Sequence, residues 1–251
     1  MNSKERFSNR VDTYVKYRPS YPVEAVDYLY TVVGLGADSK VADIGAGTGI
    51  FSERLLERGS RVTAVEPNQA MREAALEKLG GQERFHAVAG SAEVTGLPDH
   101  SADFIVCAQS FHWFDRSAAQ TEFRRVLHPG GKAVLIWNTR LTQGTPFRGA
   151  YDRLIHTFGM EYKNMAERKI SSADLSPFFK PGSMQEARFT IQQAFDYEGL
   201  SGRLLSSSFI PEPGHPGYEP MIQELKTLFD RYEQDGQVTI DYETEVYWGE
   251  V

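Results

Sequence analysis

The sequence predicts an α/β protein built on a doubly wound, seven-stranded and mostly parallel β-sheet, and three features of the chain favour this fold. Short apolar segments alternate with amphipathic helical segments over about 100 residues, from residue 40 to residue 138. The segment 102–111 is mostly apolar, as expected for a strand that is covered on both faces. The segment 238–249 alternates apolar with polar residues, so we expect it to be the last strand, antiparallel and exposed or at an edge.

In the first part of the chain, residues that are typical of helix starts or helix ends stand at several expected boundaries. Pro22 suits the first turn of a helix, Asn68 suits the N-cap of another, and Gly59 ends a third. The elements expected up to residue 138 are a helix at 21–33, strands at 40–45, 61–67, 84–93, 102–111 and 132–138, and helices at 50–59, 68–79 and 118–127. This order is typical of consecutive βαβ units, which form a parallel sheet.

Beyond residue 138 the alternation stops, and we expect additions to a single domain that spans residues 1–251. A strand at 186–197 and an amphipathic helix at 218–236 are the clearest elements of this part. The predicted organisation is a cap or lid at 1–20, a cofactor-binding core at 40–138, and helical insertions on the substrate side at 139–184 and 200–235. Long excursions of this kind usually cover active sites, so we expect the insertions to select the substrate.

The composition narrows the classes of function. The chain has 251 residues, a net charge of −7 and an isoelectric point near 5.5, which argues against binding to a nucleic-acid backbone. The single cysteine, Cys107, excludes an intramolecular disulfide, and the histidines show no metal-ligand spacing, so we expect no metal. The N-terminus lacks the apolar core of a signal peptide, and no apolar run is long enough to span a membrane. We therefore expect a cytoplasmic protein, a monomer or homodimer, that binds neither nucleic acid nor membranes.

A glycine-rich loop, built around Gly45, Ala46 and Gly47, separates the first strand from the helix that follows it. Glycines allow the backbone to approach a ligand closely, and the first turn of the helix offers unpaired N–H groups. A dinucleotide-binding loop would carry its third glycine at position 50, where this chain has Ile50. Asp43 would repel a pyrophosphate, whereas it suits a cofactor with ammonium and sulfonium charges. These residues favour S-adenosylmethionine as the cofactor, and the alternative is a tight turn with no ligand.

A second carboxylate, Glu66, ends the second strand about 20 residues past the loop. An acid at this distance can accept hydrogen bonds from both ribose hydroxyls of a nucleoside cofactor. We expect Glu66 and the adjacent Pro67 to lie against the ribose. The alternative is an acid that is merely exposed to solvent at the end of a strand.

Several segments, taken in order, resemble the motifs of the class I S-adenosylmethionine-dependent methyltransferases. They are "VADIGAGTG", "VTAVEP", "GSAEVTGLP", "ADFIVCAQSFHWF" and "VLHPGGKAVLIWN". The resemblance covers about residues 40–138 and implies a Rossmann-like sheet that binds S-adenosylmethionine. The opening "VDTYVKYRPSYP" also resembles the N-terminal cap of a small-molecule subgroup that includes the trans-aconitate-type methyltransferases.

The resemblance implies a role for each residue at the expected strand ends. The methionine part of the cofactor would be contacted by Asp43, directly or through water, and by Gly45 and Gly47, while Glu66 would hold the ribose. The adenine would lie against Ser91, Ala92 and Glu93, and the residues beneath the methionine would be Gln109, Ser110 and Phe111. Many relatives carry an acid at the position of Ser91, so whether Ser91 or Glu93 contacts the adenine amine stays open.

The N-terminal segment carries two further candidates for the cofactor site, Tyr14 and Arg18. The resemblance implies that Arg18 pairs with the cofactor carboxylate and that Tyr14 packs over it. Residues 1–20 would then form a lid that is ordered when the cofactor is present. The alternative is an arginine that is solvated in a polar arm.

Methyl transfer from a sulfonium requires alignment of the acceptor, exclusion of water and, for some acceptors, removal of a proton. His112 follows the fourth strand and is the candidate general base, because its unperturbed pKa suits that role. The alternative is that His112 only forms part of the pocket wall, with Trp113 as an apolar neighbour. The candidate substrate residues are Trp113, Trp137 and Arg140, of which the last two end the fifth strand on the same side, although a solvated Arg140 is an equal alternative.

The expected function is methyl transfer from S-adenosylmethionine to a small molecule, with a carboxylate or hydroxyl as the favoured acceptor. Two alternatives remain open from the sequence. One is an NAD(P)-dependent oxidoreductase on a similar sheet, which Asp43 and Ile50 oppose. The other is a cofactor-binding module without catalysis. A methyltransferase of nucleic-acid bases is disfavoured, because the Asn/Asp-Pro-Pro-aromatic signature of that class does not follow the fourth strand.

Overall fold

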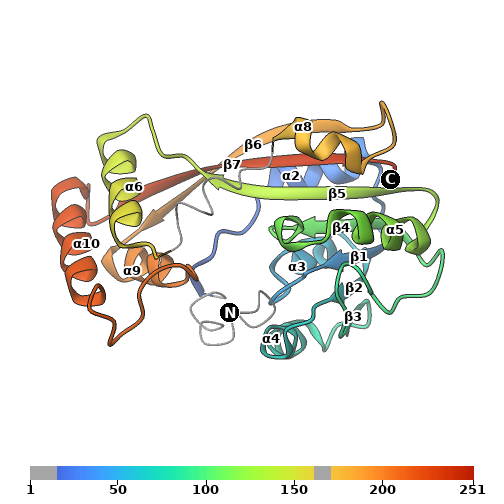
Figure 1. Cartoon of the computed structure of the whole chain (residues 1–251), viewed down its shortest axis with the longest axis horizontal. Coiled ribbons are helices and arrows are strands. Elements are labelled where there is room, and N and C mark those ends of the chain that lie inside the picture. Colours follow the sequence, from blue (N-terminus) through green and yellow to red (C-terminus); the bar gives the residue numbers. More distant parts are fainter. Residues whose placement is uncertain (1–15, 161–170) are drawn as a thin grey trace.

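The computed structural model describes residues 16–160 and 171–251, which form a seven-stranded sheet flanked by helices (Figure 1). The strands are β1 (Lys40–Ile44), β2 (Arg61–Val65), β3 (Phe85–Val88), β4 (Ala102–Ala108), β5 (Leu127–Arg140), β6 (Gln185–Phe195) and β7 (Val238–Gly249). The helices are α2 (Val23–Tyr28), α3 (Ile50–Glu57), α4 (Gln69–Leu79), α5 (Arg116–Val126), α6 (Pro146–Phe158), α8 (Ser172–Leu175), α9 (Tyr197–Leu205) and α10 (Tyr218–Tyr232). A π-helical turn η2 (Leu29–Val33) continues α2, and 3-10 turns η3 (Phe111–Trp113) and η4 (Ser176–Phe178) follow β4 and α8.

The strand order is β3-β2-β1-β4-β5-β7-β6, and the predicted fold class is confirmed. Strands β1 to β5 are parallel to one another, and β7 is antiparallel to both of its neighbours, β5 and β6. The expectation that residues 238–249 form an exposed or edge strand was wrong, because β7 lies between β5 and β6. Its alternating side chains are buried and half-buried, whereas the edge strand β6 is the one with exposed side chains along its length.

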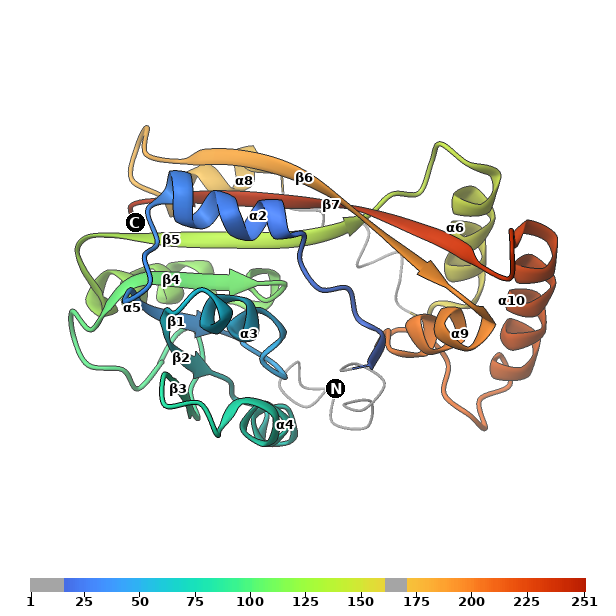
Figure 2. The ribbon, with the colours of Figure 1, turned by 180° about the vertical axis from the view of Figure 1, so that it is seen from behind.

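Two hydrophobic clusters cover the two faces of the sheet. Alternation along β5 sends Val134 and Ile136 to one face and Ala133 and Leu135 to the other. Helices α2 and α3 cover the first face, and α5 and the α8–η4 segment cover the second. Figure 2 shows α2 and α3 lying in front of the strands, and Figure 1 shows α5 and α8 on the opposite side.

A third hydrophobic cluster lies outside the sheet core, among α6, α9, α10 and the ends of β6 and β7. Tyr242 of β7 is one of its largest buried side chains, with 1% of its surface exposed. The long strands β5, β6 and β7 extend toward these helices, which stand well away from β1 to β4 (Figure 1). We call α6, α9 and α10 the helical module. The sequence did not predict α9.

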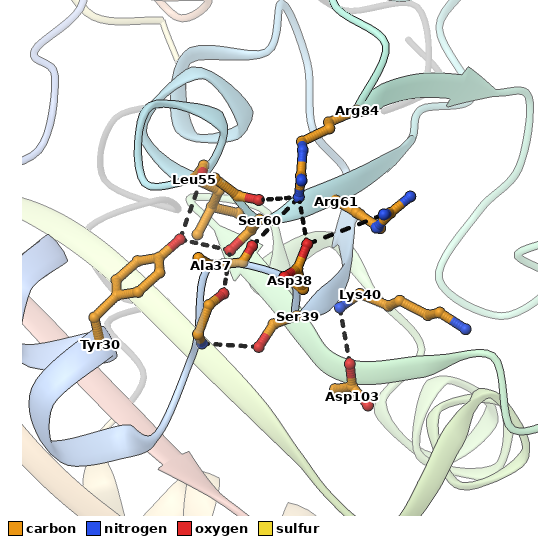
Figure 3. A network of polar contacts seen from close by, with 12 residues as sticks. Tyr30, Ala37, Asp38, Ser39, Lys40, Leu55, Ser60, Arg61, Arg84 and Asp103 are labelled. Carbon is orange, nitrogen blue, oxygen red and sulfur yellow. Dashed lines mark hydrogen bonds and ion pairs between the residues drawn. The ribbon is translucent and has the colours of Figure 1, made fainter.

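Polar contacts link the loops at the amino ends of the strands (Figure 3). Ligands bind to such sheets at the other end, where the strands have their carboxyl ends. The Tyr30 hydroxyl lies 2.6 Å from Ser60 Oγ and donates to the Leu55 carbonyl over 3.2 Å. Arg84 Nη1 donates to Asp38 Oδ1 over 2.7 Å and to a loop carbonyl, and this pairing lowers the pKa of Asp38. These contacts join the loops before β1, β2 and β3, so they stabilise the end of the sheet that carries no candidate site residue.

No helix within the described ranges is long and apolar enough to cross a membrane.

Candidate functional site

A cavity of about 350 Å³ lies at the carboxyl ends of β1, β2 and β4. Loops after these strands and after β3 form one part of its wall. Residues 18–21, together with Arg203 of α9 and the loop that follows α9, form the opposite part. Ligands bind outside the carboxyl ends of the strands in open α/β sheets, so this cavity is the candidate site.

Most of the side chains and backbone segments predicted for the site line this cavity. They are Arg18, Gly45, Ala46, Gly47, Glu66, Pro67, Ser91, Ala92, Glu93, Gln109, Ser110, His112 and Trp113. The structure therefore brings them together, while their individual roles stay predictions. Tyr14 lies outside the described residues.

Four predicted residues lie behind or beside the wall. Phe111 was predicted beneath the methionine, but it is fully buried against Phe178, because η3 turns its ring into the sheet core. Asp43 is 1% exposed, lies in β1 two residues before Gly45, and does not line the cavity. Trp137 contacts His112 rather than the cavity, and Arg140 pairs with Asp152 over 2.6 Å within the structure.

The glycine loop reaches the cavity in a conformation that only glycine adopts easily. Gly45 and Gly47 have φ angles of +69° and +57°, in the left-handed region. A Cβ atom at Gly45 would lie 2.5 Å from Ser110 Cβ, so the loop and the end of β4 are in direct contact there. At Gly47 the nearest atom to such a Cβ would be 3.9 Å away. Both the packing against Ser110 and the positive φ angle therefore require glycine at position 45, whereas at position 47 only the φ angle does.

Glu66 is held in place by two backbone donors. Gly47 N–H donates to Oε2 over 2.9 Å, and Asn68 N–H donates to Oε1 over 2.8 Å. Burial raises the pKa of Glu66, and these two hydrogen bonds oppose that rise. Each carboxylate oxygen accepts more than one hydrogen bond, so Glu66 keeps accepting capacity for a ligand at the cavity wall.

Asp43 has the most strongly shifted pKa among the carboxylates near the cavity. Ser52 Oγ donates to its Oδ2 over 2.6 Å, and its Oδ1 has no hydrogen-bond partner among the residues that the structure describes. Burial raises the pKa of Asp43 to about 7, with the nearby Glu66 carboxylate contributing in the same direction. A buried carboxylate oxygen without a partner is costly, so a cationic ligand close to the loop that follows Asp43 would stabilise the ionised form.

The raised pKa of Asp43 predicts a pH dependence of stability without ligand. The pKa is about 7 in the folded protein and 3.8 in the reference state, so unfolding releases a proton between these values. Stability is therefore expected to fall as pH rises from 4 to 7, by about 1 kcal/mol per pH unit relative to Asp43→Asn. Denaturant unfolding of both proteins at pH 5, 6 and 7 measures this difference.

Asp38→Asn is the matched control for that experiment. The pKa of Asp38 is lowered by Arg84, so Asp38 stays ionised throughout the range from pH 5 to pH 7 in both states. Its variant is expected to follow the pH slope of the unmodified protein. Parallel slopes for all three proteins would show that Asp43 is ionised at pH 5 in the folded state.

Gln109 at the end of β4 has a φ angle of +60°, which is unusual for a residue other than glycine. Its backbone N–H donates to the Ile136 carbonyl over 2.8 Å, and its Nε2 donates to the Asn138 carbonyl over 3.1 Å. Two hydrogen bonds to β5, one from the backbone and one from the side chain, therefore hold the strained residue. Strained backbone of this kind concentrates at functional sites, which fits its position on the cavity wall.

The sequence was compared with known families and proteins. Residues 42–135 match the methyltransferase domain family. An uncharacterized methyltransferase of Mycobacterium tuberculosis is 42% identical over 134 residues, and this match spans 53% of the chain and 52% of that protein, about half of its length. An uncharacterized methyltransferase of Geobacillus kaustophilus is 33% identical over 158 residues, which cover 57% of the chain and 72% of that protein. The chain belongs to the class I S-adenosylmethionine-dependent methyltransferases. A methyltransferase-like protein of Schizosaccharomyces pombe is 28% identical over 97% of the chain and 94% of its own length.

Solved structures share the fold of this methyltransferase. A protein described as a type II methyltransferase from Anaeromyxobacter dehalogenans has a TM-score of 0.66, with 23% identity over 93% of this chain and 98% of that one. Geranyl diphosphate C-methyltransferase from Streptomyces coelicolor, solved with Mg²⁺, geranyl diphosphate and S-adenosylhomocysteine, has a TM-score of 0.50 and 15% identity. The match covers 91% of this chain and 79% of the Streptomyces coelicolor chain. At these identities the likeness concerns the fold alone.

The residues of the cavity fit S-adenosylmethionine, the cofactor that membership of this family implies. Thr48 lines the cavity, and both Thr48 Oγ1 and Asp43 Oδ1 are buried and lack partners in the described part of the chain. Gly45, Ala46 and Gly47 bring the backbone of the loop to the cavity wall. Carboxylates at Asp43 and Glu66 suit an ammonium group and ribose hydroxyls. Among the described residues, no group of three or more His, Cys, Asp or Glu side chains is placed to hold a metal ion.

The part of the wall that comes from α9 was not predicted from the sequence. Arg203 from α9, and Ser208 and Phe209 just after it, line the cavity. The α9 segment contains Gly199 and Gly202, which are weak helix formers, so no helix was expected. The available signal was Asp196, an N-cap that accepts from the Gly199 N–H.

The described end of the N-terminal segment docks on α9 of the methyltransferase. Tyr17 lies so close to Gly202 that a Cβ there would be 2.2 Å from the ring. Arg18 Nη2 donates to the Ser206 carbonyl at the end of α9 over 3.0 Å. Lys16 pairs with Glu198 over 3.1 Å, with both side chains largely exposed. The segment and α9 together therefore cover the cavity from one side.

This docking makes the lid hypothesis testable by hydrogen exchange. Amides of residues 16–21 are expected to exchange more slowly after addition of S-adenosylhomocysteine, because Arg18 would then hold both α9 and the ligand carboxylate. Arg18→Ala is expected to abolish this slowing. Lys16→Ala is the control and should retain it, since an exposed ion pair contributes little. Equal exchange with and without ligand would show that the segment does not respond to the cofactor.

Proposed function

We propose that this methyltransferase transfers a methyl group from S-adenosylmethionine to a small-molecule acceptor, and that the acceptor is a carboxylate rather than a hydroxyl. The resemblance of the N-terminal cap to the trans-aconitate-type subgroup agrees with an acid. S-adenosylhomocysteine in the Streptomyces coelicolor neighbour agrees with the cofactor. The observation that carries the proposal is the distribution of charge on the cavity wall.

Acidic and basic side chains occupy opposite parts of that wall. Within the described lining, the acids are Glu66 and Glu93, which follow β2 and β3. The guanidinium groups are those of Arg18 and Arg203, which lie outside the region that matches the methyltransferase domain. The acidic part suits the ammonium and ribose of the cofactor. The basic part suits two anions, one from the cofactor and one from the acceptor.

Arg203 is the residue that we assign to the acceptor. Its Nε donates to the Tyr242 hydroxyl over 2.9 Å, and its Nη1 donates to Ser207 Oγ over 3.3 Å, so the guanidinium plane is fixed. Arg18 donates to the carbonyl of Ser206, one residue away, so the two guanidinium groups meet at the same turn. Arg18 would take the cofactor carboxylate, and Arg203 the acceptor anion beside it.

The chemistry asks little of the protein once both ligands are aligned. The bound cofactor supplies an electrophilic methyl group on a sulfonium. A carboxylate oxygen carries the attacking lone pair and no proton, so no base is needed for its methylation. Arg203 would orient that carboxylate, and the segment 18–21 with α9 would exclude water.

The experiment compares acids with their neutral counterparts. Release of S-adenosylhomocysteine is measured with a panel of small aliphatic and aromatic carboxylic acids and with the primary amide of each. Acids are expected to be methylated and amides not. Arg203→Gln should raise the KM for the best acid about 10-fold to 100-fold, the usual effect of losing a charge-assisted hydrogen bond. Arg203→Lys should keep part of the affinity.

Two controls separate binding from folding. Arg231→Gln changes an exposed arginine on α10 and should leave the kinetics unchanged. Calorimetry with S-adenosylhomocysteine should give the same affinity for Arg203→Gln as for the unmodified protein. Amides that react as well as acids, or an unchanged KM in Arg203→Gln, would contradict the assignment of the acceptor.

A further inference from the structure

His112 lines the cavity, and one of its ring nitrogens is already engaged. It lies in the η3 turn after β4, next to the wall that Gln109 and Ser110 form. The indole of Trp137, on β5, contacts it from behind. Trp137 Nε1–H donates to His112 Nδ1 with an N···N distance of 3.4 Å.

The indole is held in this orientation by aromatic rings on two sides. Trp137 meets Phe111 edge-on at 6.2 Å between ring centroids, and it meets Tyr247 edge-on at 6.0 Å. Phe111 is completely buried and Tyr247 is 3% exposed, so neither ring has room to move. The N–H of Trp137 is therefore presented to His112 by the packing of η3, β5 and β7.

The chemistry of the two rings determines where the His112 proton resides. An indole N–H only donates, so the nitrogen that faces it must offer a lone pair. A neutral imidazole with its lone pair on Nδ1 carries its proton on Nε2. An imidazolium would place two N–H groups against each other. The contact thus favours the neutral form with the proton on Nε2.

We propose that Trp137 is a positioning residue that keeps His112 as the Nε2–H tautomer, so that His112 donates a hydrogen bond to an oxygen of the acceptor and does not act as a general base. The Nδ1 lone pair is covered by the indole, and Nε2 has a proton to donate and no lone pair to accept one. This replaces the expectation of a general base at His112 and of substrate contact by Trp137. It rests on the proposed function only for the identity of the group that receives the hydrogen bond.

An acceptor carboxylate matches such a donor. Its oxygens accept hydrogen bonds and have no proton to lose, so the reaction gains orientation from His112 without any transfer of a proton. Arg203 and His112 line opposite parts of the cavity wall and would then hold the acceptor from two directions. A hydroxyl acceptor would instead need a base that His112 does not supply.

The tautomer can be measured without knowing the acceptor. Protein labelled with ¹⁵N in its histidines is studied by long-range ¹H–¹⁵N correlation at neutral pH, and His112→Gln assigns the His112 signals. We expect a protonated Nε2 and an unprotonated Nδ1. Trp137→Phe should turn this into the mixture of tautomers that a solvated imidazole shows, while Trp113→Phe, which changes the other neighbouring indole, should not. A proton on Nδ1, a charged ring, or an unchanged spectrum in Trp137→Phe would overturn the proposal.

Activity separates a donor from a base. With the best acid of the panel, His112→Gln should keep activity within about 10-fold, because its amide N–H replaces the Nε2–H, whereas His112→Ala and His112→Glu should lose about 10-fold to 100-fold. Activity in His112→Glu that exceeds that of His112→Gln would identify a base and refute the donor. If no acid is methylated, the proposed acceptor fails, while the tautomer measurement still decides the role of Trp137.

Discussion

Replacing Gly45 with alanine is expected to abolish cofactor binding and to destabilise the folded protein. The φ angle of +69° at Gly45 costs an alanine about 1–3 kcal/mol, and a Cβ atom 2.5 Å from Ser110 Cβ adds an overpacking term of similar size. Relief requires the loop or the end of β4 to move, and both line the cavity. Thermal unfolding and calorimetry with S-adenosylhomocysteine measure the two effects.

Two further variants separate the clash from the backbone strain. Gly47→Ala has a φ angle of +57° but no atom within 3.9 Å of the new Cβ, so it should be the milder change. Combining Gly45→Ala with Ser110→Gly removes the Cβ of residue 110, with which the new Cβ at position 45 clashes. The double variant should therefore be more stable than Gly45→Ala alone. If Ser110→Gly gives no such recovery, the contact between the loop and β4 is looser than the structure indicates.

Replacing Glu66 with alanine is expected to weaken binding of S-adenosylmethionine by about 3 kcal/mol, or about 100-fold. The variant loses the carboxylate that would accept the ribose hydroxyls. It also leaves the N–H groups of Gly47 and Asn68 without the acceptor that now orients the loop. Both losses act on the same part of the wall, so the effect should lie at the upper end of the range for a hydrogen bond to a charged group.

The comparison variant is Glu77→Ala, which removes an exposed acid from α4 and should leave the affinity unchanged. Calorimetry on both proteins tests the assignment. An affinity in Glu66→Ala that matches the control would remove Glu66 from the cofactor site. Circular dichroism of the variant shows whether the loss of affinity comes with loss of fold.

The part of the site that could be predicted from the sequence is the part that local chemistry determines. Glycines at a strand-to-helix turn and a carboxylate at the end of the next strand each constrain the backbone within a few residues. Gly45, Gly47 and Glu66 therefore lie where the pattern indicated, on one wall of one cavity. The alternation of strands and helices up to residue 138 likewise depends on local periodicity.

The remainder depends on contacts between distant segments, which no local pattern encodes. The placement of β7 between β5 and β6 follows from pairing across more than 40 residues of chain, so alternation alone suggested an edge. Arg203 reaches the cavity because the helical module packs its own core around Tyr242. Phe111 turns inward because Phe178 of a later segment completes its surroundings. Each of these outcomes required the tertiary structure.

The interior position of β7 has a consequence for the order in which the protein folds. β7 is the last strand in chain order, and it supplies the pairing partner of β5 over Ala133–Arg140 and of β6 along its whole length. Before β7 docks, β6 has no neighbour in the sheet, and β5 presents the unpaired backbone of an apolar segment. An open edge of that kind readily pairs with another chain. Self-association during refolding is therefore expected to be governed by the rate at which this one strand inserts, and slow insertion rather than low final stability would limit the yield of native protein.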